Sequence, residues 1–335
     1  MAQINKPDLY FNTKLYTGNG SSQSITGVGF QPDLLWIKSR GGIGNHFLSD
    51  VIRGSTKRLK SNETDAEDTI TSLSSFDSDG FTLSNTGYNG SGETFASWNW
   101  LANGAGVANT DGSISSTVSA NTTSGFSIVK WSGNETAGAS VGHGLGVAPD
   151  LIIKKRTDSS TGVWYTYNKV LGNNKSIYLN LTNAVATSGA WNNQTPTNTV
   201  FYNGSSNVEN GGTMISYCFA SVQGFSKFGS YTGNGNADGT FVYTGFKPAF
   251  VMVKENSISS WEILDSKRNT FNPTAKSIFP DGAGAEYDYT NRLDLLSNGF
   301  KLRTTSLNGS GTQSIYMAFA EQPLVGTNNI PATAR

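Results

Sequence analysis

The sequence has few of the residues on which metal and catalytic sites most often depend. Cys218 is the only cysteine among 335 residues, so the chain can form neither an intrachain disulfide nor a cysteine-ligated metal cluster. It lies in an apolar strand pattern, where a buried and inert thiol is expected. The only histidines are His46 and His143, and no nucleophile motif accompanies them. We therefore expect both histidines to be surface or turn residues, and the protein to have no enzyme activity.

Charge is also scarce, which restricts the partners that the chain can have. Charged residues make up 14% of the sequence, against roughly 25% in an average globular protein. Lys and Arg number 24, and so do Asp and Glu, so the chain has no excess of positive charge with which to bind nucleic acid. Residues 57–68 hold a mixed run of charges, where we expect a solvated loop or a short helix.

Long apolar runs are missing as well. No stretch approaches the ~20 apolar residues with which a helix crosses a bilayer, so we expect no insertion into a membrane. The first residues, MAQINKPDLYFN, also lack the basic segment and apolar core of a secretion signal. We expect a protein that is not exported through a standard signal peptide.

The residues that are abundant favour short strands joined by tight turns. The chain has 39 glycines, many Ser, Thr and Asn residues, and 11% aromatic residues. Gly and Asn are typical of turns, whereas aromatic residues are enriched in strands and supply core material. No window of the sequence shows the sustained 3.6-residue periodicity of helices. We therefore predict an all-β fold.

One stretch of sequence occurs three times along the chain. Residues 16–38 have the sequence YTGNGSSQSITGVGFQPDLLWIK, and related sequences occupy residues 130–155 and 231–254. The corner prolines of the three copies, separated by 117 and 99 residues, are Pro32, Pro149 and Pro248. The aligned residues of the closing strands, separated by 119 and 100 residues, are Trp100, Phe219 and Phe319. Two anchors with nearly equal offsets predict three tandem copies of one module.

Each copy contains an apolar run directly after its corner proline. These runs are Leu34–Ile37, Leu151–Ile153 and Phe250–Val253. Consecutive apolar residues indicate a central strand that is buried on both faces. Further along, Asp-Gly at 79–80 and Asn-Gly at 298–299 predict hairpins with type I′ turns, whose central residues have positive φ.

The repeats predict three tandem antiparallel β-sandwich domains with a jelly-roll-like arrangement. We expect the first domain at residues 1–102, a Gly/Asn linker at 103–112, the second domain at 113–221, and the third at 222–335 with a short C-terminal tail. The repeat is as long as a whole domain, far longer than the roughly 20–50 residues of a solenoid repeat.

Carboxylates offer one candidate metal site and one enzymatic alternative. Asp77 and Asp79, in the sequence FDSDG, could bind calcium, which takes about 6–8 oxygen ligands. A hairpin turn accounts for the same residues, because the full spacing of an EF-hand loop is absent. A polysaccharide-degrading enzyme would instead need a pair of carboxylates. The candidates for such a pair are Asp265, Asp281, Glu286 and Asp288.

Aromatic residues near polar loops of the second and third copies are the candidate receptor-binding residues. They are Trp164, Tyr165, Tyr167, Trp191, Trp261, Tyr287 and Tyr289. Aromatic faces rimmed by Asn and Ser suit sugars or protein epitopes. Packing in the core of a sandwich is the alternative for each of these residues.

The assembled repeat resembles a module that recurs in structural and adhesion proteins of marine bacteriophages. The similarity rests on YTGNG, GFQPDLLWIK, the segment Ser49–Gly54, the S-D-G-F turn and the closing Trp-Asn-Trp strand. It covers essentially the whole chain, and it is closest in the first copy and loosest in the second. The length and the three-module plan also resemble those of the vertex spikes of corticoviruses.

This resemblance implies a non-enzymatic spike on the virion surface, made in the host cytoplasm, that attaches to the host cell. The first module would contact other capsid proteins, and the second and third would bind a glycan or protein receptor. Such a spike would be a homo-oligomer, a pentamer at five-fold vertices, with calcium as a structural ion. A capsid decoration protein without host contact and the polysaccharide-degrading enzyme are the alternatives.

Overall fold

A computed structural model describes residues 1–84, 87–326 and 331–334 of the chain. Strands dominate, and neighbouring strands within the sheets pair antiparallel. The prediction of an all-β fold is confirmed. The helical elements of the described part are the 3-10 turn η1 (Pro7–Leu9) and the short helix α1 (Asn207–Asn210). Across these residues we find no helix with the length and apolar character needed to cross a bilayer.

The first repeat folds as two facing sheets. The larger sheet has the strand order β1 (Phe11–Thr17), β9 (Thr94–Trp100), β3 (Leu34–Ser39) and β4 (Phe47–Asp50). The facing sheet has the order β2 (Gln23–Thr26), β8 (Gly80–Leu83) and β7 (Leu73–Asp77). A separate hairpin consists of β5 (Lys57–Arg58) and β6 (Asp68–Thr69). The charged run at residues 57–68 therefore forms a hairpin in place of the expected loop or helix, and an ion pair between Arg58 and Asp68 joins its strands.

The second repeat extends the same plan into an eight-stranded sheet. The order of that sheet is β10 (Val107–Asn109), β11 (Ser116–Asn121), β12 (Phe126–Ser132), β19 (Thr213–Phe219), β14 (Leu151–Arg156), β15 (Tyr165–Asn168), β16 (Lys175–Tyr178) and β17 (Ala186–Thr187). Two further strands, β13 (Ser140–Gly142) and β18 (Val200–Tyr202), pair with each other. Residues 103–112, predicted as a linker, contribute β10 to the large sheet.

The third repeat has two four-stranded sheets. The first has the order β20 (Ser226–Thr232), β27 (Gln313–Pro323), β22 (Phe246–Glu255) and β23 (Glu262–Asp265). The second has the order β21 (Phe241–Tyr243), β26 (Gly299–Leu302), β25 (Tyr287–Leu296) and β24 (Thr274–Ser277). The second strand of this repeat pairs with the last strand but one, as it does in the first repeat.

All three repeats share the order first strand, closing strand, central strand, next strand in their larger sheets. The central strands are β3, β14 and β22, and their apolar runs are buried on both faces, as predicted. Successive residues of a central strand point to opposite faces of the sheet and pack into different hydrophobic cores. In β3, for example, Leu34 and Trp36 face one hydrophobic cluster, whereas Leu35 and Ile37 face another.

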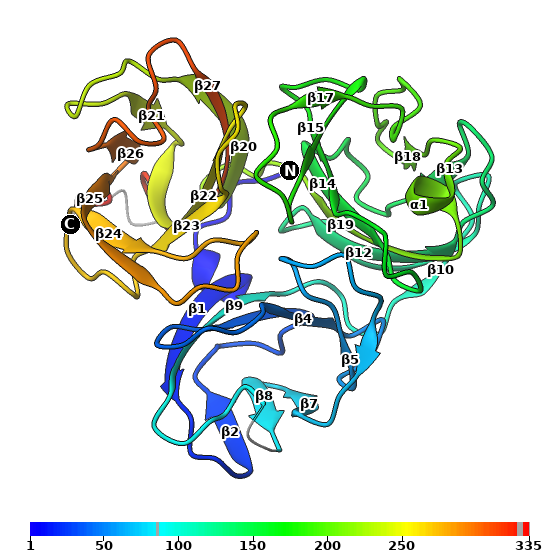
Figure 1. The fold of residues 1–335 in the computed structure, drawn as a ribbon, viewed down its shortest axis with the longest axis horizontal. Coiled ribbons are helices and arrows are strands. Elements are labelled where there is room, and N and C mark those ends of the chain that lie inside the picture. Colours follow the sequence, from blue (N-terminus) through cyan, green and yellow to red (C-terminus); the bar gives the residue numbers. More distant parts are fainter. Residues whose placement is uncertain (85–86, 327–330, 335) are drawn as a thin grey trace.

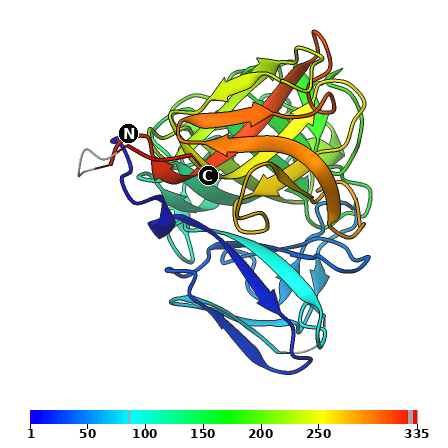
Figure 2. The same ribbon diagram turned by 90° about the vertical axis from the view of Figure 1, so that its left-hand side faces the viewer.

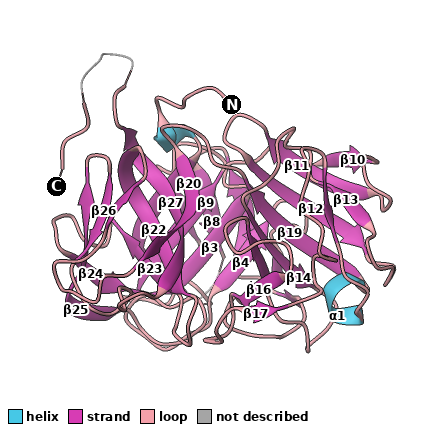
Figure 3. Cartoon of the chain, turned by 90° about the horizontal axis from the view of Figure 1, so that it is seen from above, coloured by secondary structure: helices cyan, strands magenta, loops and turns pink. Residues whose placement is uncertain are grey.

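The three larger sheets surround one common core. The repeats form three lobes around a central axis, with the first repeat in blue and cyan, the second in green and the third in yellow and orange (Figure 1). A view from the side and a view from above show the same packing of lobe against lobe (Figures 2 and 3). Large side chains from all three repeats fill the centre, among them Phe11, Trp98, Trp100, Phe126, Phe219, Phe250 and Phe319.

Each lobe also has a hydrophobic core of its own, between its larger sheet and the second layer. Cys218 lies in the core of the second lobe, where burial raises the pKa of its thiol, so the prediction of a buried cysteine is confirmed. Because the lobes share the central core, the structure presents three sandwich-like units fused into one body. Their count as separate domains stays a prediction.

The predicted hairpins form, but their glycines have a different role from the one expected. Asp77 pairs with Gly80 and Leu296 pairs with Gly299, so the turns consist of residues 78–79 and 297–298. A Cβ atom on Gly80 would collide with the carbonyl oxygen of Ile25, and one on Gly299 with that of Val242. Glycine is needed because a neighbouring strand approaches closely, not because the turn requires two residues with positive φ.

Candidate binding groove at a junction between repeats

Five of the seven aromatic residues predicted to bind a receptor lie in the interior. They are Trp164, Tyr165, Tyr167, Trp191 and Trp261. The exposed fractions of these side chains run from 0% to 7%, so they cannot contact a receptor in this structure. Their placement corrects the expectation of an aromatic recognition surface, because large rings in an all-β chain stabilise most when they are buried.

Tyr287 and Tyr289 are the two candidates that reach the surface. Both lie on β25, and their ring centroids are 4.3 Å apart. Tyr287 is 56% exposed, and the guanidinium of Arg292 lies 3.3 Å from the ring centroid of Tyr289. Contact of this aromatic pair with a receptor stays a prediction.

The predicted calcium ligands hold a turn together. The carboxylate of Asp79 accepts hydrogen bonds from the backbone N–H groups of Gly27 and Gly29 at 2.9 and 2.6 Å. These bonds lower the pKa of the Asp79 carboxyl. Asp77 accepts hydrogen bonds from two hydroxyl groups. Within the described ranges, no three or more His, Cys, Asp or Glu residues lie close enough together to hold a metal ion.

Three of the four carboxylates considered for an enzyme take part in internal contacts. Asp265 and Glu286 both form ion pairs with the buried Arg268, at 2.6 and 3.3 Å. Asp281 accepts a hydrogen bond from the backbone N–H of Trp261 at 3.0 Å. The fourth residue, Asp288, is exposed on β25.

Three equivalent ring N–H groups join the repeats in a closed circle. Each of the three donors comes directly before the strand that follows the central strand in the shared order. His46 precedes β4, Trp164 precedes β15 and Trp261 precedes β23. Each side chain reaches a backbone carbonyl of another repeat. The bonds join Trp164 to Lys60, Trp261 to Tyr178 and His46 to Phe279, at 2.9, 2.8 and 2.9 Å. Every repeat thus donates to the preceding one, and the first donates to the third, as in a head-to-tail ring.

A second set of equivalent bonds fixes the backbone at the same three places. The backbone N–H groups of His46, Trp164 and Trp261 each donate to a side-chain oxygen at 3.0 Å. The accepting residues are Asn62, Asn180 and Asp281. The aromatic residues predicted as a receptor surface therefore include two that hold the repeats together.

His46 is held in one neutral form. The indole N–H of Trp36 donates to its Nδ1 at 2.7 Å, so Nε2 carries the proton that it donates to Phe279. Burial, and next the charge of Lys38, lower the pKa of His46 to about 3. His143 is also fully buried, and burial lowers its pKa. Both histidines are therefore buried, His46 directly before β4 and His143 directly after β13, and neither is the surface residue that the expectation of surface or turn histidines allowed.

Buried ion pairs occur at two of the three junctions. Asp50 and Arg53 form a pair at 2.6 Å, and Asp50 also accepts a hydrogen bond from Tyr217 of the second repeat at 2.8 Å. The corresponding pair of the third repeat, Asp265 with Arg268, accepts a hydrogen bond from Trp98 of the first repeat at 3.1 Å. At the remaining junction, the equivalent positions hold Asn168, Leu171 and Met317. Both sides of this junction thus change together: Asn168 and Leu171 replace the ion pair, and Met317 replaces the hydrogen-bond donor.

Each junction also forms a groove where the closing strand of one repeat meets the first strand of the next. At the junction of the first and second repeats, the residues after β9 fold into it: Ala102 and Gly104 donate backbone N–H groups to the carboxylate of Asp33. At the junction of the third and first repeats, the N-terminal segment lies beside it, where Asn12 donates to the carbonyl of Asp8. The groove left there has a volume of about 110 Å³.

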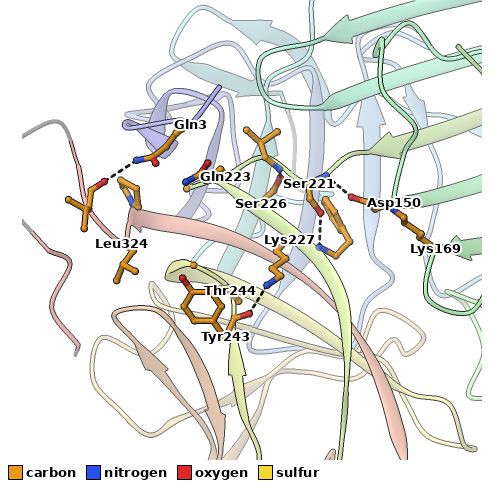
Figure 4. Close-up of a pocket in the computed structure, with 16 residues that line it drawn as sticks. Gln3, Asp150, Lys169, Ser221, Gln223, Ser226, Lys227, Tyr243, Thr244 and Leu324 are labelled. Carbon is orange, nitrogen blue, oxygen red and sulfur yellow. Dashed lines mark hydrogen bonds and ion pairs between the residues drawn. The ribbon is translucent and has the colours of Figure 1, made fainter. Parts of the chain in front are cut away.

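The junction of the second and third repeats has an open groove. Residues 221–225 connect its two sides, Gln3 of the N-terminal segment also lines it, and its volume is about 610 Å³. Ligand pockets typically have roughly 300–1,000 Å³. The charged side chains that line this groove are Asp150, Lys169 and Lys227 (Figure 4).

Lys227 and Tyr243 form one wall of this open groove. The ammonium group of Lys227 donates to the backbone carbonyl of Tyr243 at 2.8 Å and lies 5.2 Å from the centroid of its ring. The side chain of Tyr243 is 52% exposed. On the other side, Lys169 pairs with Asp150 at 3.2 Å, and the Asp150 carboxylate accepts the backbone N–H of Ser221 (Figure 4).

This groove was not predicted from the sequence. One signal could have pointed to it. Lys227 stands at a position of the first strand where the other two repeats have Asn12 and Ser127. A residue type found in one copy but not at the equivalent positions of the other copies is a candidate for a function of that copy alone. The fold does not require it, because the other copies fold with different residues there.

The fold and the groove define a class of protein, an all-β chain of three fused repeats with a groove between the second and third. A family model described as "Domain of unknown function (DUF7483)" matches residues 6–323, so the chain belongs to this family. No curated protein and no solved structure matches the chain.

Proposed function

We propose that the protein is a non-enzymatic attachment protein on a virion surface, which binds the surface of the host cell. One observation carries the proposal. The equivalent positions of the three repeats hold side chains that contact other parts of the molecule. The surface available for recognition is therefore at positions where the repeats differ. His46, Trp164 and Trp261 illustrate the first group, and Lys227 with Tyr243 the second.

Rigidity supports this role. The three repeats share one core and are joined by a closed circle of hydrogen bonds, so the surface loops are held on a common base. A binding surface that is already ordered loses less conformational entropy when it binds its partner. Tyr287 and Tyr289 on β25 would add a second contact area on the third repeat.

The resemblance to phage modules adds three further parts to the proposal. The first repeat would contact other capsid proteins, the chain would assemble as a homo-oligomer, a pentamer at a vertex, and calcium would bind at Asp77 and Asp79. Mass measurement of the purified protein in solution tests the assembly. Unfolding temperatures with calcium and with a chelator test the ion, and Asp79→Asn should abolish any stabilisation by calcium.

The attachment role is tested with the purified chain and with particles. Antibodies against the chain should label intact virions, and the fluorescently labelled chain should bind host cells and compete with virions for them. Labelled particles without cell binding or competition would support the alternative, a capsid decoration protein. Absence of the chain from particles would overturn both. New reducing ends after incubation with host polysaccharide would point to an enzyme.

A further inference from the structure

We infer that the open groove between the second and third repeats binds an acidic saccharide, with its sugar ring against Tyr243 and its carboxylate or sulfate at Lys227. The inference rests on the proposed attachment function and names the class of host molecule that would be recognised.

The first step is that the open groove between the second and third repeats differs from those at the other two junctions. At the junction of the first and second repeats, a groove of about 630 Å³ is lined by Ile52, Lys130 and Trp131 among others, but the Trp131 ring is buried. The groove beside Tyr243 has about 610 Å³, against about 110 Å³ at the junction of the third and first repeats, which the N-terminal segment narrows. The larger volume is suited to a short oligosaccharide, because ligand pockets of roughly 300–1,000 Å³ hold molecules of drug size.

The second step is the charge of the lining. Lys169 and Lys227 outnumber Asp150, and Asp150 is already bound by Lys169 and by the N–H of Ser221. The ammonium of Lys227 uses one of its three N–H donors for the carbonyl of Tyr243, which leaves donors for a ligand. An anionic group is therefore favoured over a neutral or cationic one, and a charge-assisted hydrogen bond to it is stronger than a neutral one.

The third step concerns the groups around this charge. Tyr243 presents a half-exposed ring next to the ammonium group, and an aromatic ring packs well against the apolar face of a sugar. The side chain of Gln223 is exposed in the same groove and has no hydrogen-bond partner within the described part of the chain. Its amide can both donate to and accept from hydroxyl groups. Ring, amide and cation together fit a sugar acid better than an acidic peptide.

The test measures binding of defined probes to the full chain by calorimetry and by ligand-observed NMR. The probes are trigalacturonic acid and its methyl ester, which has the same rings without the charges. We expect the acid to bind about tenfold more tightly than the ester, since only the acid gains the charge-assisted bonds. Equal binding of the two probes, or binding of neither, would overturn the inference. So would preferential binding of a capped tri-glutamate peptide.

Variants locate the binding within the groove. Lys227→Met and Tyr243→Ala should each weaken binding of the acid about tenfold, whereas Lys227→Arg should retain most of it. Lys169→Met provides a safer variant, because its side chain is 68% exposed and makes a surface ion pair. It should weaken binding of the acid a few-fold, in keeping with a cation at the edge of the site. Unchanged affinity in all three loss variants would place any binding elsewhere.

The matched control is Lys175→Met. Lys175 lies on β16, outside the groove, and donates to the hydroxyl of Thr187 at 2.8 Å. It should bind the acid as the wild type does. Cell binding separates the two proposals: a Lys227→Met variant that loses the saccharide but still binds cells would overturn the role of the acidic saccharide in host recognition and leave the attachment role standing. A wild-type chain that binds the saccharide but no cells overturns the attachment role alone.

Discussion

The Nε2 atom of His46 lies 2.9 Å from the carbonyl oxygen of Phe279, although 233 positions separate the two residues in the sequence. This bond closes the circle that Trp164 and Trp261 continue at the other junctions. The indole N–H of Trp36 donates a hydrogen bond to Nδ1, so the proton of the imidazole stays on Nε2. A neutral imidazole is therefore a structural requirement where the first and third repeats meet.

Acid should weaken this junction. Burial lowers the pKa of His46 to about 3, whereas the unfolded chain has a value of about 6.5. The unfolded state therefore binds the extra proton first, and stability is lost as the pH falls from about 6.5 toward 3. Between pH 7 and pH 5 we expect His46 to contribute a loss of about 2 kcal/mol in the free energy of unfolding, measured by urea denaturation.

A variant that copies the third repeat provides the control. Trp36→Met with His46→Trp reproduces Met252 and Trp261, which occupy the equivalent positions there. We expect this double variant to fold and to lose less stability between pH 7 and pH 5 than the wild type. His143 remains in both proteins, so its own acid dependence cancels. An unchanged pH dependence would show that His46 does not set it.

The buried pair of Asp50 and Arg53 offers a second prediction. Arg53→Leu should cost about 3 kcal/mol or more of unfolding free energy, because it leaves the Asp50 carboxylate buried without its partner. The side chains of both residues are at most 1% exposed. Thermal or urea unfolding at neutral pH measures the loss.

The junction of the second and third repeats, which has no ion pair at these positions, suggests a variant that should restore stability. Replacing Asp50 by Asn, Arg53 by Leu and Tyr217 by Met copies the residues found between the second and third repeats. We expect this triple variant to regain most of the stability lost by Arg53→Leu, because a buried ion pair can be exchanged for well-packed apolar residues at little net cost. A triple variant as unstable as the single one would argue against this coupling of both sides of the junction.

Lys154 should make the protein more stable as the pH rises from about 7 to about 9. Burial lowers its pKa to about 7, against about 10.4 in the unfolded chain, while the charge of Glu209 acts in the opposite direction. In this window the unfolded state binds more protons, so stability rises by about 2 kcal/mol. Urea unfolding at pH 7, 8 and 9 measures the slope.

The variant Lys154→Met isolates this effect. It leaves the carbonyl of Ala190 and the amide of Asn203 without their partner, so overall stability falls. The readout is the slope with pH, which should become flatter, whereas Lys175→Met should keep the slope of the wild type. The remaining slope should come from Lys38, Lys155 and Lys254, whose pKa values burial also lowers, to about 8. A slope unaffected by Lys154→Met would refute the assignment.

Gly299 should resist substitution for steric reasons. Its Cβ would collide with the carbonyl oxygen of Val242 on the neighbouring strand β21, so Gly299→Ala should cost about 1–3 kcal/mol or more. Gly189→Ala is the control, because no atom lies within 4 Å of the added Cβ. That change should be neutral or stabilise the protein by up to about 1 kcal/mol. Thermal unfolding of the two variants compares them directly.

Part of the fold was predictable because local residue patterns cause it. The apolar runs after the corner prolines predicted strands buried on both faces, and these strands occupy that place in all three larger sheets. The charged run at residues 57–68 was not predicted as a hairpin, because its strands are stabilised by pairing across the run. The groove was not predicted at all, since Asp150 and Tyr243 belong to different repeats and line one groove only when those repeats pack together.

The stretch at residues 16–38, which recurs in the other two copies, shows which part of the fold could be predicted from the sequence. Its Gly-Asn turn has the same function in each copy, because the side-chain oxygen of its asparagine accepts a hydrogen bond from the side-chain amide of a second asparagine. The accepting residues Asn19, Asn134 and Asn234 are bound by Asn89, Asn210 and Asn308, respectively. Such a framework follows from the sequence, because every copy carries the Gly-Asn pair and a second asparagine ahead of its closing strand.

The sequence by itself determined the all-β class, the repeat and the strands at the centre of each sheet. The tertiary structure decided that the copies close into a ring, which aromatic residues lie inside it, and which residues line the grooves between the copies. The physical reason is that burial and partner choice depend on the surfaces of other repeats. Trp164 and Tyr287 are both aromatic residues near polar loops in the sequence, but Trp164 meets Lys60 of the first repeat, whereas Tyr287 is 56% exposed.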